Sequence, residues 1–377
     1  MSSLLLIALT AAHATTPAEM GGLITGGGLD HDVPQPIING DDASADEYPQ
    51  AGGIIMDSRV GSYGIPLLTC TSTLIAPDTV MLAAHCVDPE TLAQMGAQMG
   101  VNNLAVDGFF WTRQADLTDY DGYSPTTPLP ADAAYAPNDD AHVAYHDAFS
   151  INGMDLGLAE NHDIALLFLD APTTGQWAYL PTADEATQIV EDVEVDVVGW
   201  GQQTATGFNE APPPGTVGEK EVGTSHIAEL GAAEFQVGAE QSDVRKCHGD
   251  SGGPTFWHAT TDSQESLRVI GITSHSYDYS DCANKGGVDT RVDAYLEWIS
   301  TEMTSRCEAG TRSWCEQTGI PVLPYDVDED GIVDWQDEKI KKALCSASSG
   351  EASLMMAFVG LGAIMSRRRR GSALRTR

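Results

Sequence analysis

Short apolar runs separated by turn-forming residues fill the middle of this chain, and they constrain its fold most. From Ile37 onward these runs include AGGIIM, LLTCTSTLIA, TVMLAAHC, DIALLFL, VEVDVVGWG and SLRVIGITSH. They are rich in β-branched residues, and their lengths suit antiparallel strands. One helical pattern, DAYLEWISTEM, follows near residue 300, with Asp293 as its expected N-cap. Many short strands and few helices predict an all-β barrel or sandwich.

The two ends of the chain differ in character from this strand-rich region. Residues 1–14 join an apolar stretch to the small-residue sequence AHA, which indicates a secretory signal peptide; the alternative is a buried N-terminal strand. Residues 15–36 are rich in Gly and Pro and read as a pro-segment. After the strand-rich region 37–303 we expect a linker at 304–324, a calcium-loop and helix segment at 325–344, and a sorting or anchor tail at 345–377.

Charge and cysteine content narrow the possible partners and compartment. The 377 residues carry 55 acids against 19 bases, a net charge of −36, which repels nucleic-acid backbones and argues against such a partner. Export would place the seven cysteines where disulfides persist. Because seven is odd, at least one cysteine stays unpaired within the chain.

The sequence CHGDSGGP at residues 247–254 is the first candidate for a catalytic segment. By itself it reads either as a flexible turn or as a turn that presents Ser251 as a nucleophile. Serine catalysis also needs a neutral imidazole to take the proton and a carboxylate to orient that imidazole. His85 ends an apolar run, and Asp163 stands just ahead of another. Each residue alone is more typical of a structural role, but together they favour catalysis.

These segments together resemble the trypsin-like serine proteases, which have the chymotrypsin fold. The resemblance covers residues 37–303 and rests on IING, LAAHC, DIALL, VVGWG, CHGDSGGP, GITSH and YLEWI. It implies two packed six-stranded antiparallel β-barrels with a C-terminal helix, and an active site in the cleft between the barrels. It implies serine endopeptidase activity on protein or peptide substrates, with no cofactor for catalysis.

The resemblance assigns roles to the three residues of the expected triad. Ser251 would attack the scissile carbonyl, His85 would act as base and then acid, and Asp163 would orient His85. The backbone N–H groups of Gly249 and Ser251 would form the oxyanion hole.

Cysteine positions fit the same family. By resemblance Cys70 would pair with Cys86, and Cys247 with Cys282. Spacing suggests a third, more local pair between Cys307 and Cys315.

Activation in this family depends on a new N-terminus. Here Ile37 would supply the ammonium group and Asp250 the buried carboxylate that receives it. The alternative is that Asp250 only caps a turn. Pro36 precedes Ile37, where a basic residue would be needed for a trypsin-like activator. The activating protease is therefore unknown.

The specificity pocket departs from that of trypsin. Arg245, followed by Lys246, stands two residues before Cys247, at the position expected at the base of the pocket. We hypothesise a preference for acidic residues before the scissile bond, helped by His248 or Lys285. Ser276 replaces a pocket-wall glycine and would narrow the entrance. The alternative is that Arg245 turns outward or pairs with Asp243, leaving an apolar or small pocket.

The sequence DVDEDGIVDWQD near the C-terminus fits the template of a calcium-binding loop. It resembles half of a dockerin repeat, without a second copy. Gly331 supplies the sharp turn, and the alternative is a solvated acidic loop. The expected Ca²⁺ ligands are Asp326, Asp328, Asp330, Ile332 (through its carbonyl), Asp334 and Asp337.

The last residues resemble the Cys-containing sorting signals of Gram-negative bacteria. Cys345 opens a polar spacer, and an apolar run at 354–365 precedes an arginine cluster. Twelve residues are too few for an ordinary membrane span. On this interpretation a sorting enzyme leaves Cys345 as the attachment point on the outer membrane; the alternative is a marginal anchor or a disordered basic tail.

The sequence therefore predicts an exported or surface-anchored serine endopeptidase, activated by cleavage before Ile37. Its rival is a catalytically silent protease homologue that acts as a calcium-dependent surface binding module. The complete Ser, His and Asp set favours the enzyme.

Overall fold

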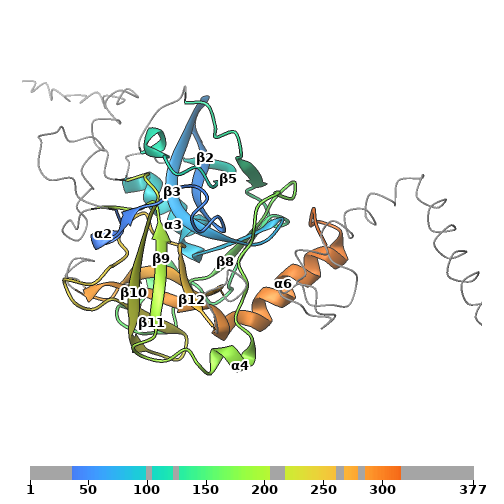
Figure 1. Ribbon diagram of the computed structural model, residues 1–377. Coiled ribbons are helices and arrows are strands. Elements are labelled where there is room, and N and C mark those ends of the chain that lie inside the picture. Colours follow the sequence, from blue (N-terminus) through green and yellow to red (C-terminus); the bar gives the residue numbers. More distant parts are fainter. Residues whose placement is uncertain are drawn as a thin grey trace, which may run out of the picture. The chain divides into compact units, whose positions relative to one another are not determined.

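The computed structural model describes residues 36–98, 104–121, 127–203, 217–259, 267–278 and 285–315. These residues all belong to one compact unit. Two antiparallel sheets follow one another along the chain, and Figure 1 shows them with the helix α6 (Leu296–Ala309) beside them. No helix among the described residues is long and apolar enough to span a membrane.

The first sheet contains seven strands in the order β6-β5-β2-β3-β4-β8-β7. Long β2 and β3 form a hairpin of ten paired residues at its centre, closed by a turn at Gly61. Along the chain its strands are β2 (Ala51–Val60), β3 (Tyr63–Ala76), β4 (Thr79–Leu82), β5 (Ala105–Thr112), β6 (Ala134–Pro137), β7 (Val143–Tyr145) and β8 (Ala165–Phe168).

The second sheet closes into a barrel. Its order is β1-β10-β11-β14-β13-β12-β9, and an added pairing of β9 with β10 completes a six-stranded ring to which β1 attaches. Its strands are β1 (Asp41–Asp42), β9 (Glu194–Gly199), β10 (Glu221–Leu230), β11 (Glu234–Val237), β12 (Pro254–His258), β13 (Leu267–Ser276) and β14 (Gly287–Arg291). The expected architecture of two barrel-like antiparallel sheets with a C-terminal helix is confirmed: the second sheet closes with six strands and carries β1 in addition, and the first has seven strands.

Buried apolar residues of the strands, many of them at consecutive positions, form the core of each sheet. The first core includes Ile54, Phe109 and Leu166, and it extends to α6 through Ile299. The second core packs Ile37 against strands of the closed barrel. Burial of such side chains is the main favourable contribution to folding.

Helices occupy more of the chain than the sequence pattern predicts. Residues 87–161 read as strands with surface loops, but helix α3 (Pro89–Gln98) begins two residues after the first of them. A short α4 (Ala183–Ala186) carries a capping box between Thr182 and Glu185. Asp293 is not the N-cap of α6; its carboxylate pairs with Arg291 at 2.6 Å instead.

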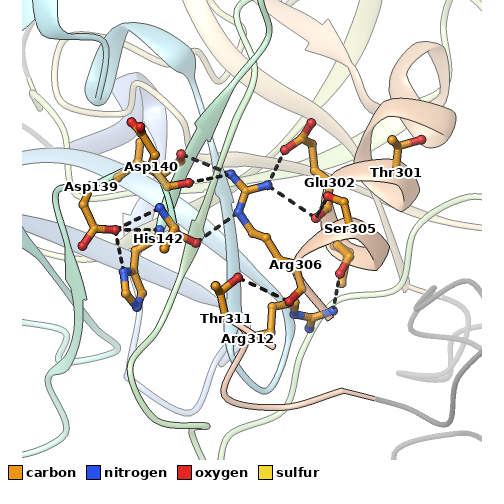
Figure 2. Close-up of polar contacts among 12 residues, drawn as sticks. Asp139, Asp140, His142, Thr301, Glu302, Ser305, Arg306, Thr311 and Arg312 are labelled. Atoms are coloured by element: carbon orange, nitrogen blue, oxygen red, sulfur yellow. Dashed lines mark hydrogen bonds and ion pairs between the residues drawn. The ribbon is translucent and has the colours of Figure 1, made fainter. Parts of the chain in front are cut away.

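The compact unit also extends beyond the predicted boundary at residue 303. Helix α6 runs to Ala309, and Arg306 near its end donates to the carbonyls of Asp140, Ala141 and Val143 (Figure 2). Arg312 then pairs with buried Asp78 at 2.5 Å, and neither side chain is exposed. Residues 304–315 therefore belong to the folded domain, not to a linker, because Arg312 supplies the buried counter-charge of Asp78 and Arg306 donates to carbonyls within residues 140–143.

Candidate active site

Ser251 lies in a tight turn before β12, and glycines make this turn possible. Gly249 and Gly252 have φ of 96° and 79°, in the left-handed region that favours glycine. A Cβ at Gly249 would also lie 2.7 Å from the Cα of Gly201. Thr71 of β3 holds the turn, since its N–H donates to the Ser251 carbonyl (2.9 Å) and its hydroxyl donates to the Gly249 carbonyl (3.1 Å).

The same turn leaves two backbone donors available. Within the described part of the chain, the N–H groups of Gly249 and Ser251 donate no hydrogen bond, whereas the N–H of Asp250 between them donates to the Cys247 carbonyl. Converging N–H groups of this kind stabilise a developing oxyanion.

His85 and Asp163 are in direct polar contact. His85 lies in a short 3₁₀ turn (Ala84–Cys86), and its Nδ1 is 2.7 Å from Oδ2 of Asp163. The backbone N–H of His85 also donates to Oδ1 of Asp163 at 2.9 Å. The imidazole is 17% exposed, whereas the Asp163 side chain is fully buried. The pair therefore presents the ring to solvent and hides the carboxylate behind it.

Burial and pairing oppose each other in the electrostatics of this pair. Burial alone would lower the pKa of His85, but the charge and hydrogen bond of Asp163 outweigh it and hold that pKa above its ordinary value. Burial alone would raise the pKa of Asp163, but His85 and the hydroxyl of Ser274 hold it below the ordinary range. The carboxylate is thus ionised when the imidazole is neutral.

Sequence reasoning did not assign a role to Ser274, although the motif GITSH contains it. Its hydroxyl donates to Oδ2 of Asp163 at 2.6 Å, and Thr290 donates to the Asp163 carbonyl at 3.0 Å. Strands β13 and β14 supply these donors. The sequence feature that could have identified Ser274 is its location at the buried end of an apolar strand.

A cavity of about 320 Å³ joins these groups. Ser251 and His85 both line it, and within the described residues the Ser251 hydroxyl makes no hydrogen bond. Catalytic hydrogen bonds are often long in unliganded enzymes and tighten on binding. The other lining residues are Ile151, Met154, Asp155, Leu156, Lys246, Cys247, His248, Thr273, Ser274, His275, Ser276 and Gly287.

The expected pocket residues divide into two groups. His248 and Ser276 line the cavity. Arg245 does not, because its guanidinium donates to the carbonyls of Gln241 and Asp243. Lys285 is exposed and lies outside the lining. The cation that borders the cavity is Lys246.

The two expected activation residues are both buried. Ile37 is fully enclosed in the core of the closed barrel, where it is still joined to Pro36 by an amide. Asp250 accepts hydrogen bonds from the N–H groups of Gly201 and Cys247, each at 2.8 Å. Burial raises the pKa of Asp250 to about 6, although these two donors oppose the shift.

Disulfides brace the region around the site. Cys70 is bonded to Cys86, next to His85, and Cys307 to Cys315 at the end of α6. Cys247 is also disulfide-bonded, and its expected partner Cys282 lies outside the described residues. Sulfur atoms of Cys70 and Cys86 lie within 4.8 Å of a ring nitrogen of His85, but their disulfide leaves no thiolate to bind a metal ion there.

Several predictions fall on residues outside the described ranges. These are the signal peptide at 1–14, most of the pro-segment, the attachment residue Cys345, and the calcium ligands Asp326, Asp328, Asp330, Ile332, Asp334 and Asp337.

The two barrel-like sheets and the buried His–Asp pair beside a glycine-rich serine turn define the class of serine endopeptidases with the chymotrypsin fold. Comparison with known proteins supports the same class. Residues 131–299, which contain Asp163 and Ser251, match the family model of trypsin.

Individual relatives are distant but cover much of the chain. A trypsin of Saccharopolyspora erythraea is 24% identical over 71% of this chain and 99% of its own length. Human kallikrein-11 is 25% identical over 63% of this chain and 72% of its own. Bovine chymotrypsin-C is 26% identical, over 62% and 78% respectively. The chain is therefore similar to the trypsin-like serine endopeptidases, in sequence and in fold.

Proposed function

We propose that this protein hydrolyses peptide bonds through a Ser251–His85–Asp163 triad. The observation that carries the proposal is the 2.7 Å contact between His85 Nδ1 and buried Asp163, beside a cavity that Ser251 also lines. With Nδ1–H donating to the carboxylate, the neutral ring keeps its Nε2 lone pair for the serine proton.

The chemistry follows from this placement. Ser251 Oγ attacks the scissile carbonyl as its proton passes to His85 Nε2, and Asp163 stabilises the resulting imidazolium. The oxyanion accepts hydrogen bonds from the N–H groups of Gly249 and Ser251, and loss of one such donor costs about 3 kcal/mol of transition-state stabilisation. His85 then returns the proton to the leaving amine, and water repeats the sequence on the acyl-enzyme.

Labelling with a fluorophosphonate tests the nucleophile directly. We expect the chain that begins at Ile37 to become labelled at Ser251 and to cleave a denatured protein substrate. Ser251→Ala should lose both signals, and Ser225→Ala, a buried serine of β10, should keep them. Lack of labelling in a folded, correctly started chain would favour the catalytically silent homologue.

We also propose that cleavage before Ile37 activates the enzyme. Asp250 supports this, because it is a buried carboxylate whose described hydrogen bonds come from backbone N–H groups and whose pKa is raised. A new ammonium group at Ile37 would provide the cation that such a carboxylate favours. N-terminal sequencing of active protein tests this, and a labelled form that starts upstream of residue 37 contradicts it.

We also propose that the enzyme acts outside the cell. Disulfides persist in oxidising compartments. Cys70, Cys247 and Cys307 each take part in a disulfide bond. Attachment through Cys345 to the outer membrane and Ca²⁺ binding at the C-terminal loop remain proposals from sequence. Cell fractionation of wild type and Cys345→Ala tests the attachment, since only the wild type should sediment with membranes.

A further inference from the structure

A buried ion pair lies behind the candidate pocket. Lys246 precedes Cys247 and borders the cavity that contains Ser251. Its Nζ donates to Oδ2 of Asp289 at 2.6 Å, and neither side chain is exposed to solvent. Thr255 of β12 donates to the same oxygen at 2.5 Å. The pair therefore connects the segment before the nucleophile turn to strand β14.

The strand register places this pair beside the cavity wall. Asp289 pairs with Thr273 of β13, and Gly287 pairs with Ser276. Thr273, Ser276 and Gly287 all line the cavity. A Cβ built on Gly287 would lie 3.8 Å from Cβ of Lys246. Lys246 is thus next to the wall formed by the ends of β13 and β14.

The charges at this wall balance. A buried ammonium or carboxylate is costly unless it is paired, and here each compensates the other. Asp250 lies near Lys246 as well, but its two oxygens accept the N–H groups of Gly201 and Cys247. Arg245, the other basic residue of this segment, donates instead to the carbonyls of Gln241 and Asp243.

We propose that the Lys246–Asp289 pair determines primary specificity by giving the pocket a charge-balanced wall, so that the enzyme cleaves after uncharged side chains. This inference rests on the proposed function, because it takes the Ser251 cavity as the subsite for the residue before the scissile bond. It replaces the hypothesis of an acidic preference based on Arg245.

Variants that remove one charge of the pair test the inference, because each leaves the charge of the other member unpaired. Peptides that differ only before the scissile bond, with Gln, Glu or Lys, would be compared by kcat/KM. The wild type should prefer Gln over both charged residues by about tenfold or more. Asp289→Asn uncovers the Lys246 ammonium and should raise the Glu-to-Gln ratio about tenfold, whereas Lys246→Met uncovers Asp289 and should raise the Lys-to-Gln ratio similarly.

The double variant Lys246→Met/Asp289→Asn has neither charge and should retain the wild-type ratios. Arg245→Met is the matched control and should leave all ratios unchanged, since Arg245 lies outside the cavity lining. Fluorophosphonate titration gives the folded, active fraction of each variant. If a single variant does not fold, the wild type and the double variant still decide the question, because a difference in charge preference between them overturns the proposal.

Outcomes separate the specificity proposal from the proposed function. An active, labelled wild type that prefers a charged residue overturns the specificity proposal alone. Single variants that fold yet keep the wild-type kcat/KM ratios also overturn the specificity proposal alone. A change in these ratios that is confined to Arg245→Met would assign specificity to Arg245. An unlabelled, inactive wild type overturns the proposed function, and the specificity proposal with it.

Discussion

The raised pKa of His85 has a direct consequence for the pH dependence of activity. Only the neutral ring accepts the serine proton, so kcat/KM should fall as pH decreases through a pKa above the ordinary value of about 6.5. The contribution of His85 protonation to stability runs the other way: it is complete below the unfolded pKa of the imidazole and is lost as pH rises through the raised folded pKa. A pH–rate profile of kcat/KM checks the first statement.

The pH–rate profile of Asp163→Asn tests whether Asp163 is the cause of the raised His85 pKa. The substitution removes the charge that raises the pKa of His85, so the acidic limb should move to lower pH while the rate falls about 10⁴-fold. An acidic limb that stays in place would contradict the assignment of Asp163 as the source of the shift.

Ser274 provides a second test at the residue scale. Its only hydroxyl proton goes to charged Asp163, although Nδ1 of His275 lies 3.0 Å away on the other side. Hydrogen bonds to charged groups contribute about 1.5–3 kcal/mol, so Ser274→Ala should lower kcat/KM by about 10- to 100-fold. Ser225→Ala removes a bond to the neutral carbonyl of Val244 and should change kcat/KM little. Equal effects of the two variants would argue against a positioning role for Ser274.

The residue scale also shows where sequence interpretation stops. The sequence contexts of His85, Asp163 and Ser251 were specific enough to propose that all three belong to one site. The cavity is lined by Lys246 and not by Arg245, the cation expected from the sequence, because neighbours in an extended segment point in opposite directions. Which of Arg245 and Lys246 borders the cavity depends on the partner Asp289, which lies 43 residues away in the sequence.

At the scale of elements, the segment after α6 should contribute substantially to stability. Arg312 donates to Asp78 and Thr79, and both charged side chains of the pair are unexposed. Arg312→Ala would leave Asp78 without its counter-ion, which typically costs about 3–5 kcal/mol. Urea unfolding should show this loss. Arg59→Ala removes an exposed pair with Asp107, which solvent screens, and should change stability little. Similar losses for both variants would contradict the argument.

Strand β11 begins with a second testable group, Glu234. Its carboxylate accepts the N–H groups of Ala159 and Asn161, close to the segment that carries Asp163. Burial raises the pKa of Glu234 to about 7, against these donors. A raised folded pKa gives stability that is present below the unfolded value of about 4.5 and lost as pH rises through 7. Stability should therefore decrease with pH over this window.

Glu234→Gln cannot ionise, and its slope of melting temperature against pH between 5 and 8 should be flatter than that of the wild type. Glu194→Gln, on the exposed start of β9, serves as the control and should keep the wild-type slope. Buried Asp250 adds a slope of the same sign in every variant, so the comparison isolates Glu234. Parallel curves for wild type and Glu234→Gln would refute the assignment.

Elements differ in how well their patterns predict them. The strands around DIALLFL and VEVDVVGWG were expected because continuous or alternating apolar residues fit buried strands. Helix α3, with the sequence PETLAQMGAQ, was missed because it lies in a segment whose Gly, Pro and Asp content indicates loops. The domain end was placed too early because the roles of Arg306 and Arg312 depend on partners in the first sheet.

The two sheets act together at the scale of the whole molecule. The first supplies His85 and Asp163, the second supplies Ser251 and Ser274, and Thr71 of the first sheet holds the serine turn of the second. Local motifs could predict this division because each residue of the proposed triad lies in a short, recognisable context. The wall formed by Ile151, Met154, Asp155 and Leu156 could not be predicted, since no pattern in that segment specifies which surface it covers.

Net charge gives a final prediction for the molecule as a whole. With 55 acids and 19 bases, self-repulsion opposes the compact state, and salt relieves it because the Debye length falls from about 10 Å at 0.1 M to about 3 Å at 1 M. The buried pairs Arg312–Asp78 and Lys246–Asp289 are shielded from solvent and should be weakened little. The melting temperature should therefore rise by about 5 °C between 0.05 and 1 M NaCl. The measurement is made in EDTA so that contaminating Ca²⁺ cannot contribute, and KCl should give the same rise if screening is the cause. A melting temperature that falls with either salt would mean that attractive exposed pairs outweigh the repulsion among the acidic residues.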